Sequence, residues 1–171
     1  MKNQLQIQFI DHASIARGFK KHNGNKQMTR KNSKEEFEFH HTLRVRYAES
    51  DPQGIVFNAN YLVYFDVTIT EYFRFHGLPY GESVSTHGID FHVVHCSIDY
   101  KAPAHFDEEL QIYVKGSYSG VKIFWDLAVF KENTLICSGN LVYAGVDVVN
   151  GGLRKIEPNL ASILKLKSKS E

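Results

Sequence analysis

The chain has 171 residues, 43% hydrophobic and 13% aromatic, a composition typical of one globular domain and not of a disordered chain. No apolar run approaches the roughly 18 residues that a bilayer-spanning helix needs, so we expect no membrane span. The net charge of +1 divides unequally: residues 1–34 carry +7, and the remaining 137 residues carry −6. Because the body lacks a broad basic field, no nucleic-acid partner is expected.

The first 34 residues are polar and basic, with no sustained apolar periodicity. We expect a disordered leader at 1–34 and a folded domain at 35–171. Contact with nucleic acid or anionic lipid and an organelle presequence are alternative interpretations of this leader. Translation starting at Met28 is another, and the intact mass of the native protein would test it. No secretory signal is evident, and we expect a cytoplasmic location.

The pattern becomes regular from Phe37 onward. The segment "FEFHHTLRVRYAE" alternates with period two and predicts a strand, and "DPQG" has turn chemistry. Apolar residues then recur every three or four positions from about Asn58 to His76, which predicts a long helix ending at Gly77. Aromatic and β-branched residues occupy nearly every side of this helix, so we expect a curved sheet to wrap around it.

Four later segments supply the rest of that sheet: "HGIDFHVVHCSIDYKAP", "EELQIYVKGSYSG", "VKIFWDLAVFKEN" and "TLICSGNLVYAGVDV". Hairpin turns at 119–120 and 131–133 make neighbouring strands antiparallel. A short amphipathic helix is expected after Glu157. The fold class is therefore α+β, with a long central helix wrapped by an antiparallel sheet of about five strands.

Several kinds of site lack a matching pattern. Cys96 and Cys137 lie in apolar strands without metal-ligand spacing, and we expect two buried, reduced thiols, with a disulfide as the open alternative. His40 and His41 are neighbours on a strand and point to opposite faces. No metal site and no cofactor are predicted.

Asp51 is the most promising candidate for chemistry. It lies at a strand end, three residues before Gly54 and shortly before the predicted helix start. The unpaired N–H groups of a helix start can hold a carbonyl oxygen, and a nearby carboxylate can attack the carbonyl carbon or activate water. Gly54 would let the backbone approach a ligand closely. The simpler alternative is that Asp51 only begins an Asp-Pro turn.

The stretch "RYAESDPQGIVFNANYLVYFDVTITEYFRFHGLP", at 46–79, resembles the acyl-CoA thioesterases of the 4-hydroxybenzoyl-CoA thioesterase family. The similarity continues more loosely through "IDYKAPAHFDEELQIYV" and "LRKIEP". It implies a hotdog fold and hydrolysis of an acyl-CoA thioester to a free acid and coenzyme A, which is part of the substrate. Asn58 departs from the aromatic or His residue that is commoner at its position in the family.

The resemblance implies Asp51 as nucleophile or general base, with backbone N–H groups around Phe57, Asn58 and Ala59 polarising the carbonyl. The expected catalytic positions are Asp51, Gly54, Asn58 and Ala59. The expected substrate-binding positions, which include cations for the coenzyme A phosphates, are Phe57, Asn60, Tyr61, Phe91, His92, Lys101, Arg154 and Lys155.

Hotdog domains usually pair, so the resemblance also implies a homodimer or a dimer of dimers, with Asp51 of one chain facing residues such as Phe91 or His92 of the other. Two alternatives stay open: a non-catalytic acyl-binding hotdog protein, and a thioesterase that acts on acyl-carrier-protein thioesters. The sequence does not identify the acyl group.

Overall fold

The computed structural model describes residues 33–169, and the leader predicted at 1–34 lies almost entirely outside them. Two short 3-10 helices, η1 (Lys34–Glu36) and η2 (Tyr47–Glu49), flank strand β1 (Phe39–Arg44). The other elements in chain order are α2 (Asn60–Phe75), α3 (Tyr80–His87), β2 (Ile89–Tyr100), β3 (Glu109–Ser119), β4 (Lys122–Lys131), β5 (Thr134–Asp147), α4 (Pro158–Ile163) and β6 (Lys167–Ser168).

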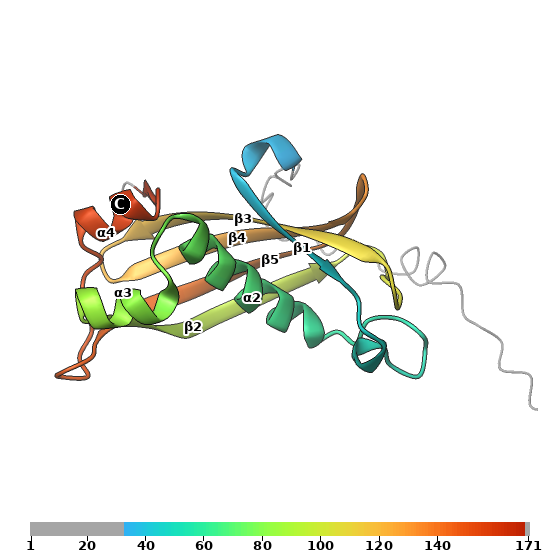
Figure 1. The fold of residues 1–171 in the computed structure, drawn as a ribbon, viewed down its shortest axis with the longest axis horizontal. Helices are drawn as coiled ribbons and strands as arrows, with labels where there is room; N and C mark the ends of the chain where they lie inside the picture. The colour runs from blue at the N-terminus through green and yellow to red at the C-terminus, as the bar shows by residue number, and fades with distance from the viewer. Residues whose placement is uncertain (1–32, 170–171) are drawn as a thin grey trace, which may run out of the picture. The chain divides into compact units, whose positions relative to one another are not determined.

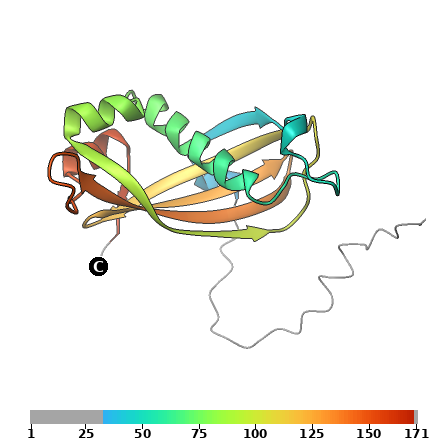
Figure 2. The same cartoon turned by 90° about the horizontal axis from the view of Figure 1, so that it is seen from below.

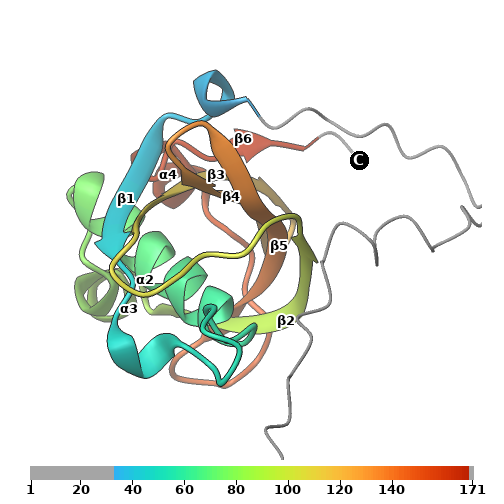
Figure 3. The same ribbon diagram turned by 90° about the vertical axis from the view of Figure 1, so that its right-hand side faces the viewer.

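The main sheet has the order β1-β3-β4-β5-β2, and each neighbouring pair is antiparallel. The short strand β6 is the exception, because it pairs parallel to β3. The sheet curves around α2, which lies along its concave face (Figures 1 and 2). Figure 3, seen along the strands, shows them surrounding the helix. The predicted α+β class is confirmed.

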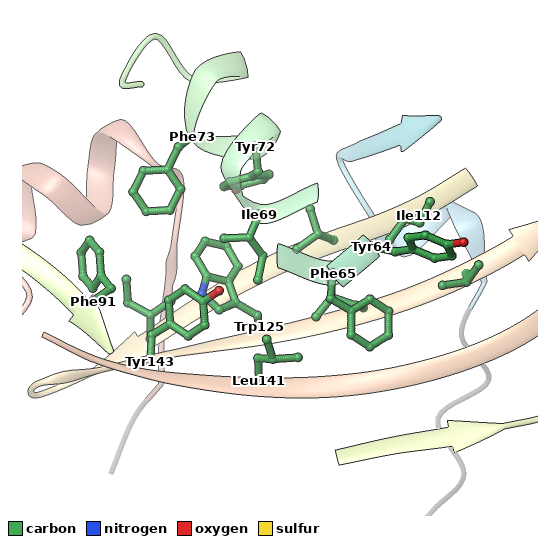
Figure 4. Close-up of a cluster of buried hydrophobic side chains, with 14 of the residues drawn as sticks. Tyr64, Phe65, Ile69, Tyr72, Phe73, Phe91, Ile112, Trp125, Leu141 and Tyr143 are labelled. Atoms are coloured by element: carbon green, nitrogen blue, oxygen red, sulfur yellow. The ribbon is translucent and has the colours of Figure 1, made fainter. Parts of the chain in front are cut away.

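The helix α2 fits this position because its buried residues recur at three- and four-residue intervals. They are Tyr61, Tyr64, Phe65, Thr68, Ile69, Tyr72 and Phe73. These side chains meet inward-facing residues of the sheet such as Trp125 and Leu141 (Figure 4). Gly139 of β5 admits the Phe65 ring, because a Cβ at that glycine would collide with the ring. The sheet therefore contacts the helix closely.

The edge strand β2 differs from the strands at the centre of the sheet. Its residues 92–97 are all exposed, and Val93 and Val94 each expose 54% of their surface. The outer side of α2 also carries exposed apolar residues, Leu62, Val63 and Val67. An edge strand has unpaired backbone groups that can pair with another chain. The edge strand β2 and the outer side of α2 therefore expose apolar side chains that are separate from the core.

The two cysteines are free thiols. Cys137 is buried as predicted, but the prediction that Cys96 is buried is wrong, because β2 is an edge strand and its middle residues are exposed. Cys96 pairs with Leu141 in register, whereas Cys137 lies opposite Tyr100. Among residues 33–169, no helix is long and apolar enough to cross a membrane.

Candidate active site

The candidate site is the loop between β1 and α2, drawn in teal in Figure 1. Asp51 begins a tight turn in which its backbone N–H donates to the Ile55 carbonyl at 2.9 Å. The Gly54 N–H returns to the Asp51 carbonyl at 2.9 Å, and Gly54 has φ +78°, a conformation that favours glycine. Ser50 and Val56 pair across the base of this loop. These contacts hold Asp51 at the end of a small, closed turn.

The Asp51 carboxylate is partly exposed, and its Oδ1 accepts the Gln53 N–H at 2.8 Å. This hydrogen bond belongs to the Asp-Pro turn that the simpler interpretation of Asp51 predicts. One N–H donor does not saturate a carboxylate, which has about four lone-pair sites. The turn therefore orients the Asp51 side chain and still leaves acceptor capacity for a ligand or water.

Unpaired backbone donors lie where the loop enters α2. Within residues 33–169, no protein acceptor pairs with the N–H of Asn58 or of Ala59. The Phe57 N–H, by contrast, donates to the Glu49 carbonyl at 2.9 Å. The expectation that Phe57 contributes a free N–H is therefore corrected, because a main-chain acceptor already uses this group. Two adjacent donors are left to bind a carbonyl oxygen.

Side chains brace this entrance from two sides. The Asn60 amide Nδ2 donates to the Glu49 carbonyl at 2.8 Å, so its donor serves the protein itself. The Tyr100 hydroxyl, at the end of β2, donates to the Asn58 carbonyl at 2.9 Å. Tyr61 is only 3% exposed, and its ring packs edge-on against Tyr64 and Tyr100. Phe57 is half exposed and is available to line a bound ligand.

A buried carboxylate lies beneath the loop. Glu49 is 6% exposed, and it accepts hydrogen bonds from the Arg46 backbone N–H at 2.7 Å, the Arg46 Nε at 2.8 Å and the Tyr64 hydroxyl at 2.8 Å. Burial alone would raise the pKa of Glu49, but the hydrogen bonds from Arg46 and Tyr64 outweigh it and hold the pKa below its ordinary value. Glu49 is therefore ionised in the folded protein at neutral pH. The residue pattern did not single it out.

The remaining predicted ligands are not brought to Asp51 within one chain. Ile89, at the start of β2, pairs with Asp147, while Tyr100 at its other end contacts Asn58. The strand has 12 residues, so its ends are separated by roughly 35 Å at about 3.3 Å per residue. Phe91, His92 and Arg154 belong to the far end. Lys101 is exposed and follows the near end directly.

Arg154 already has several partners. Its guanidinium donates to the Gly88 carbonyl at 2.9 Å and to Glu157 at 2.7 Å, and it lies 3.4 Å from Asp147. These contacts fasten the segment after β5 to the end of α3. Its neighbour Lys155 is exposed. Of the two predicted phosphate ligands, Lys155 is thus the more accessible.

A cavity of about 250 Å³ opens between α2 and β2, and sequence reasoning missed it. Its lining residues are Asp66, Ile69, Thr70, Tyr80, Phe91, Val93 and Tyr143. The Tyr143 hydroxyl lies 3.4 Å from Asp66, and burial followed by the nearby Asp66 charge raises the pKa of Tyr143. The available signal in the sequence was a charged residue, Asp66, within the aromatic and β-branched run of the predicted helix. Among the described residues, no cluster of three or more His, Cys, Asp or Glu side chains suits a metal ion.

The sheet wraps around α2, and the loop that carries the Asp51 carboxylate leads directly to the free N–H groups at the start of this helix. The family model of the thioesterase superfamily matches residues 53–138, half of the chain, so the chain belongs to this superfamily. The match begins two residues after Asp51.

Sequence relatives and solved structures are consistent with this superfamily. The Escherichia coli acyl-CoA thioester hydrolase YbgC is 26% identical over 129 residues, covering 74% of this chain and 96% of that protein. A solved hypothetical protein from Aquifex aeolicus has a TM-score of 0.69 and 27% identity, covering 74% of this chain and 98% of its own.

A 1,4-dihydroxy-2-naphthoyl-CoA thioesterase from Synechocystis has a TM-score of 0.67 over 74% of this chain and 95% of its own, at 17% identity, and supports the fold alone. The predictions of a hotdog fold and of a thioesterase are confirmed. The roles of individual site residues stay predictions.

Proposed function

We propose that the chain hydrolyses acyl-CoA thioesters to a free carboxylic acid and coenzyme A, with Asp51 as the reacting carboxylate. The observation that carries this proposal is the hydrogen bond from the Phe57 N–H to the Glu49 carbonyl. This bond joins Glu49, two positions before Asp51, to Phe57. Phe57 directly precedes Asn58 and Ala59, whose N–H groups are free. The carboxylate and the donors therefore belong to one braced unit.

The chemistry follows from this pairing. The free N–H groups stabilise the negative charge that develops on the thioester oxygen during attack. Asp51 either attacks the carbonyl carbon, giving a mixed anhydride that water then hydrolyses, or removes a proton from the attacking water. In both routes the carbon–sulfur bond breaks and coenzyme A leaves as the thiolate, which takes up a proton.

The cavity beside α2 of a second copy of the chain is our candidate compartment for the acyl group, because the Phe91 end of β2 lies far from Asp51 within one chain. Ile69, Phe91 and Val93 give its lining apolar surface that suits a hydrocarbon or a ring, and polar groups from Asp66, Thr70 and the two tyrosines line it as well. An acyl group that carries a hydroxyl could donate a hydrogen bond to the Asp66 carboxylate, whereas a plain alkyl chain would displace water from this carboxylate without replacing the hydrogen bond. We therefore expect hydroxylated acyl groups to react faster than alkyl groups of equal size.

A second copy of the chain would complete the site. Antiparallel pairing of two β2 edges brings the Phe91 end of one strand next to the Tyr100 end of the other. That arrangement carries Phe91, His92 and Lys155 of the second copy toward Asp51, and it covers the exposed valines of β2 and α2. The dimer, the alternative tetramer and the cytoplasmic location stay predictions.

Release of free thiol tests the proposal. The protein is incubated with propionyl-, hexanoyl-, palmitoyl-, benzoyl- and 4-hydroxybenzoyl-CoA, and the free thiol is titrated with a chromogenic disulfide. Turnover of one or more esters supports hydrolysis. Binding without thiol release would instead favour the non-catalytic acyl-binding alternative. Faster release from the same acyl groups on a carrier protein would move the substrate class to acyl-carrier-protein thioesters.

A further inference from the structure

Glu49 is the only charged residue that is buried within the described part of the chain. The Arg46 backbone N–H and the Tyr64 hydroxyl meet its Oε2, while the Arg46 Nε meets its Oε1. Tyr64 belongs to the buried face of α2, and Arg46 follows β1 closely. The side chain of Glu49 is therefore fixed against both the central helix and the end of the strand.

The backbone of Glu49 also holds the donor turn, residues 57–60, which carries the two free N–H groups. Its carbonyl oxygen accepts two hydrogen bonds, from the Phe57 N–H at 2.9 Å and from the Asn60 Nδ2 at 2.8 Å. These two donors lie immediately before and after Asn58 and Ala59, whose own N–H groups are free. The Glu49 carbonyl group thus accepts hydrogen bonds from both ends of the donor turn.

The chain continues from Glu49 directly into the reactive turn. Ser50 pairs with Val56, and the Asp51 N–H donates to the Ile55 carbonyl. Only Ser50 separates the anchored Glu49 from Asp51, so a shift of Glu49 displaces the Asp51 carboxylate. The same shift moves the Glu49 carbonyl, which accepts the hydrogen bonds from the donor turn.

We infer that Glu49 is a positioning residue for thioester hydrolysis, and that its buried side chain sets the placement of Asp51 relative to the free N–H groups of Asn58 and Ala59. This inference rests on the proposed function. A residue that merely stabilises the fold would lower the unfolding free energy and leave turnover of the folded protein unchanged. A positioning residue lowers kcat in protein that is still folded, because small displacements of reacting groups are costly.

Two tyrosines of α2 provide a matched pair of variants. Tyr64 and Tyr72 are each 2% exposed, and each hydroxyl donates one hydrogen bond of 2.8 Å, Tyr64 to Glu49 and Tyr72 to the Leu164 carbonyl. Tyr64→Phe and Tyr72→Phe remove the same atom from the same helix. Only the first of them loosens Glu49.

The kinetic test uses the best ester of the acyl-CoA panel at a temperature where both variants are folded. We expect Tyr64→Phe to lower kcat about tenfold with KM within about twofold, and Tyr72→Phe to stay within about twofold in both. Glu49→Gln should lower kcat further than Tyr64→Phe. Equal kcat values for the two tyrosine variants would overturn the inference.

Amide hydrogen exchange supplies a readout that does not depend on activity. The Phe57 N–H should exchange at least about tenfold faster in Tyr64→Phe than in Tyr72→Phe, because its acceptor is loosened. Unchanged protection of Phe57 would refute the anchoring role, even if no ester of the panel reacts. Full activity of Asp51→Asn would remove the proposed function itself, whereas loss of activity in Asp51→Asn with a fully active Tyr64→Phe would remove only this inference.

Discussion

Replacing Glu49 by Gln should lower the unfolding free energy by about 2 kcal/mol at pH 7, and part of this cost should disappear in acid. Hydrogen bonds to a charged group contribute about 1.5–3 kcal/mol each. The Arg46 side chain is 75% exposed, so its contribution is discounted for screening by solvent. The Arg46 backbone N–H and the Tyr64 hydroxyl then dominate, and the Gln oxygen keeps one of these bonds. About 2 kcal/mol remains.

The pH dependence follows from the lowered pKa of Glu49 in the folded state. Its contribution to stability is complete above the unfolded pKa of about 4.3 and is lost as pH falls through the folded pKa. At pH 4 the unfolded chain binds more protons at this carboxylate than the folded chain does. The difference in unfolding free energy between wild type and Glu49→Gln should therefore be smaller at pH 4 than at pH 7.

Urea unfolding at both pH values, at one fixed protein concentration, measures this difference. A cost that is equal at pH 7 and pH 4 would refute the argument, because it would mean that the charge of Glu49 does not stabilise the fold. A smaller cost at pH 7 than at pH 4 would contradict the direction of the pKa shift.

Three further predictions concern the surfaces around the site. Asp66→Ala should reduce the ratio of 4-hydroxybenzoyl-CoA to benzoyl-CoA turnover by about tenfold, since a hydroxyl loses its partner, and an unchanged ratio would exclude Asp66 from the acyl compartment. Val94→Asp, which places like charges across paired β2 edges, should give monomers by light scattering and lower thiol release; an active monomer would contradict the shared site. A maleimide should label Cys137 only in urea, because burial raises the pKa of the Cys137 thiol to about 12. Rapid native labelling of Cys137 would show that its strand opens.

The helix and the hairpins were predictable because local patterns determine them. The three-to-four spacing placed the long helix at about 58–76, and it spans Asn60–Phe75 in the structure. The turns at 119–120 and 131–133 join β3 to β4 and β4 to β5. The helix α3 was missed, because Tyr80–His87 is short, contains Gly81 and has few apolar residues to give a period.

The parts that escaped prediction depend on contacts between distant residues. Whether an N–H is free cannot be read from its own residue: Phe57 loses its donor to the carbonyl of Glu49, eight positions earlier. The burial of Cys96 depended on the strand order, which places β2 at an edge. Arg154 looked like a free cation, yet it bonds to Gly88, 66 positions away. Residue type suggested the chemistry, and the tertiary contacts decide which groups are available.

The most direct test of the account is thiol release by Asp51→Asn. Asp126→Asn is the matched control, because Asp126 is also partly exposed and accepts one hydrogen bond, from Asn140, on the opposite face of the sheet. We predict that Asp51→Asn lowers kcat by about 10²- to 10⁴-fold with an unchanged unfolding midpoint, and that Asp126→Asn matches the wild type. An Asp51→Asn protein that releases coenzyme A at the wild-type rate would contradict the account.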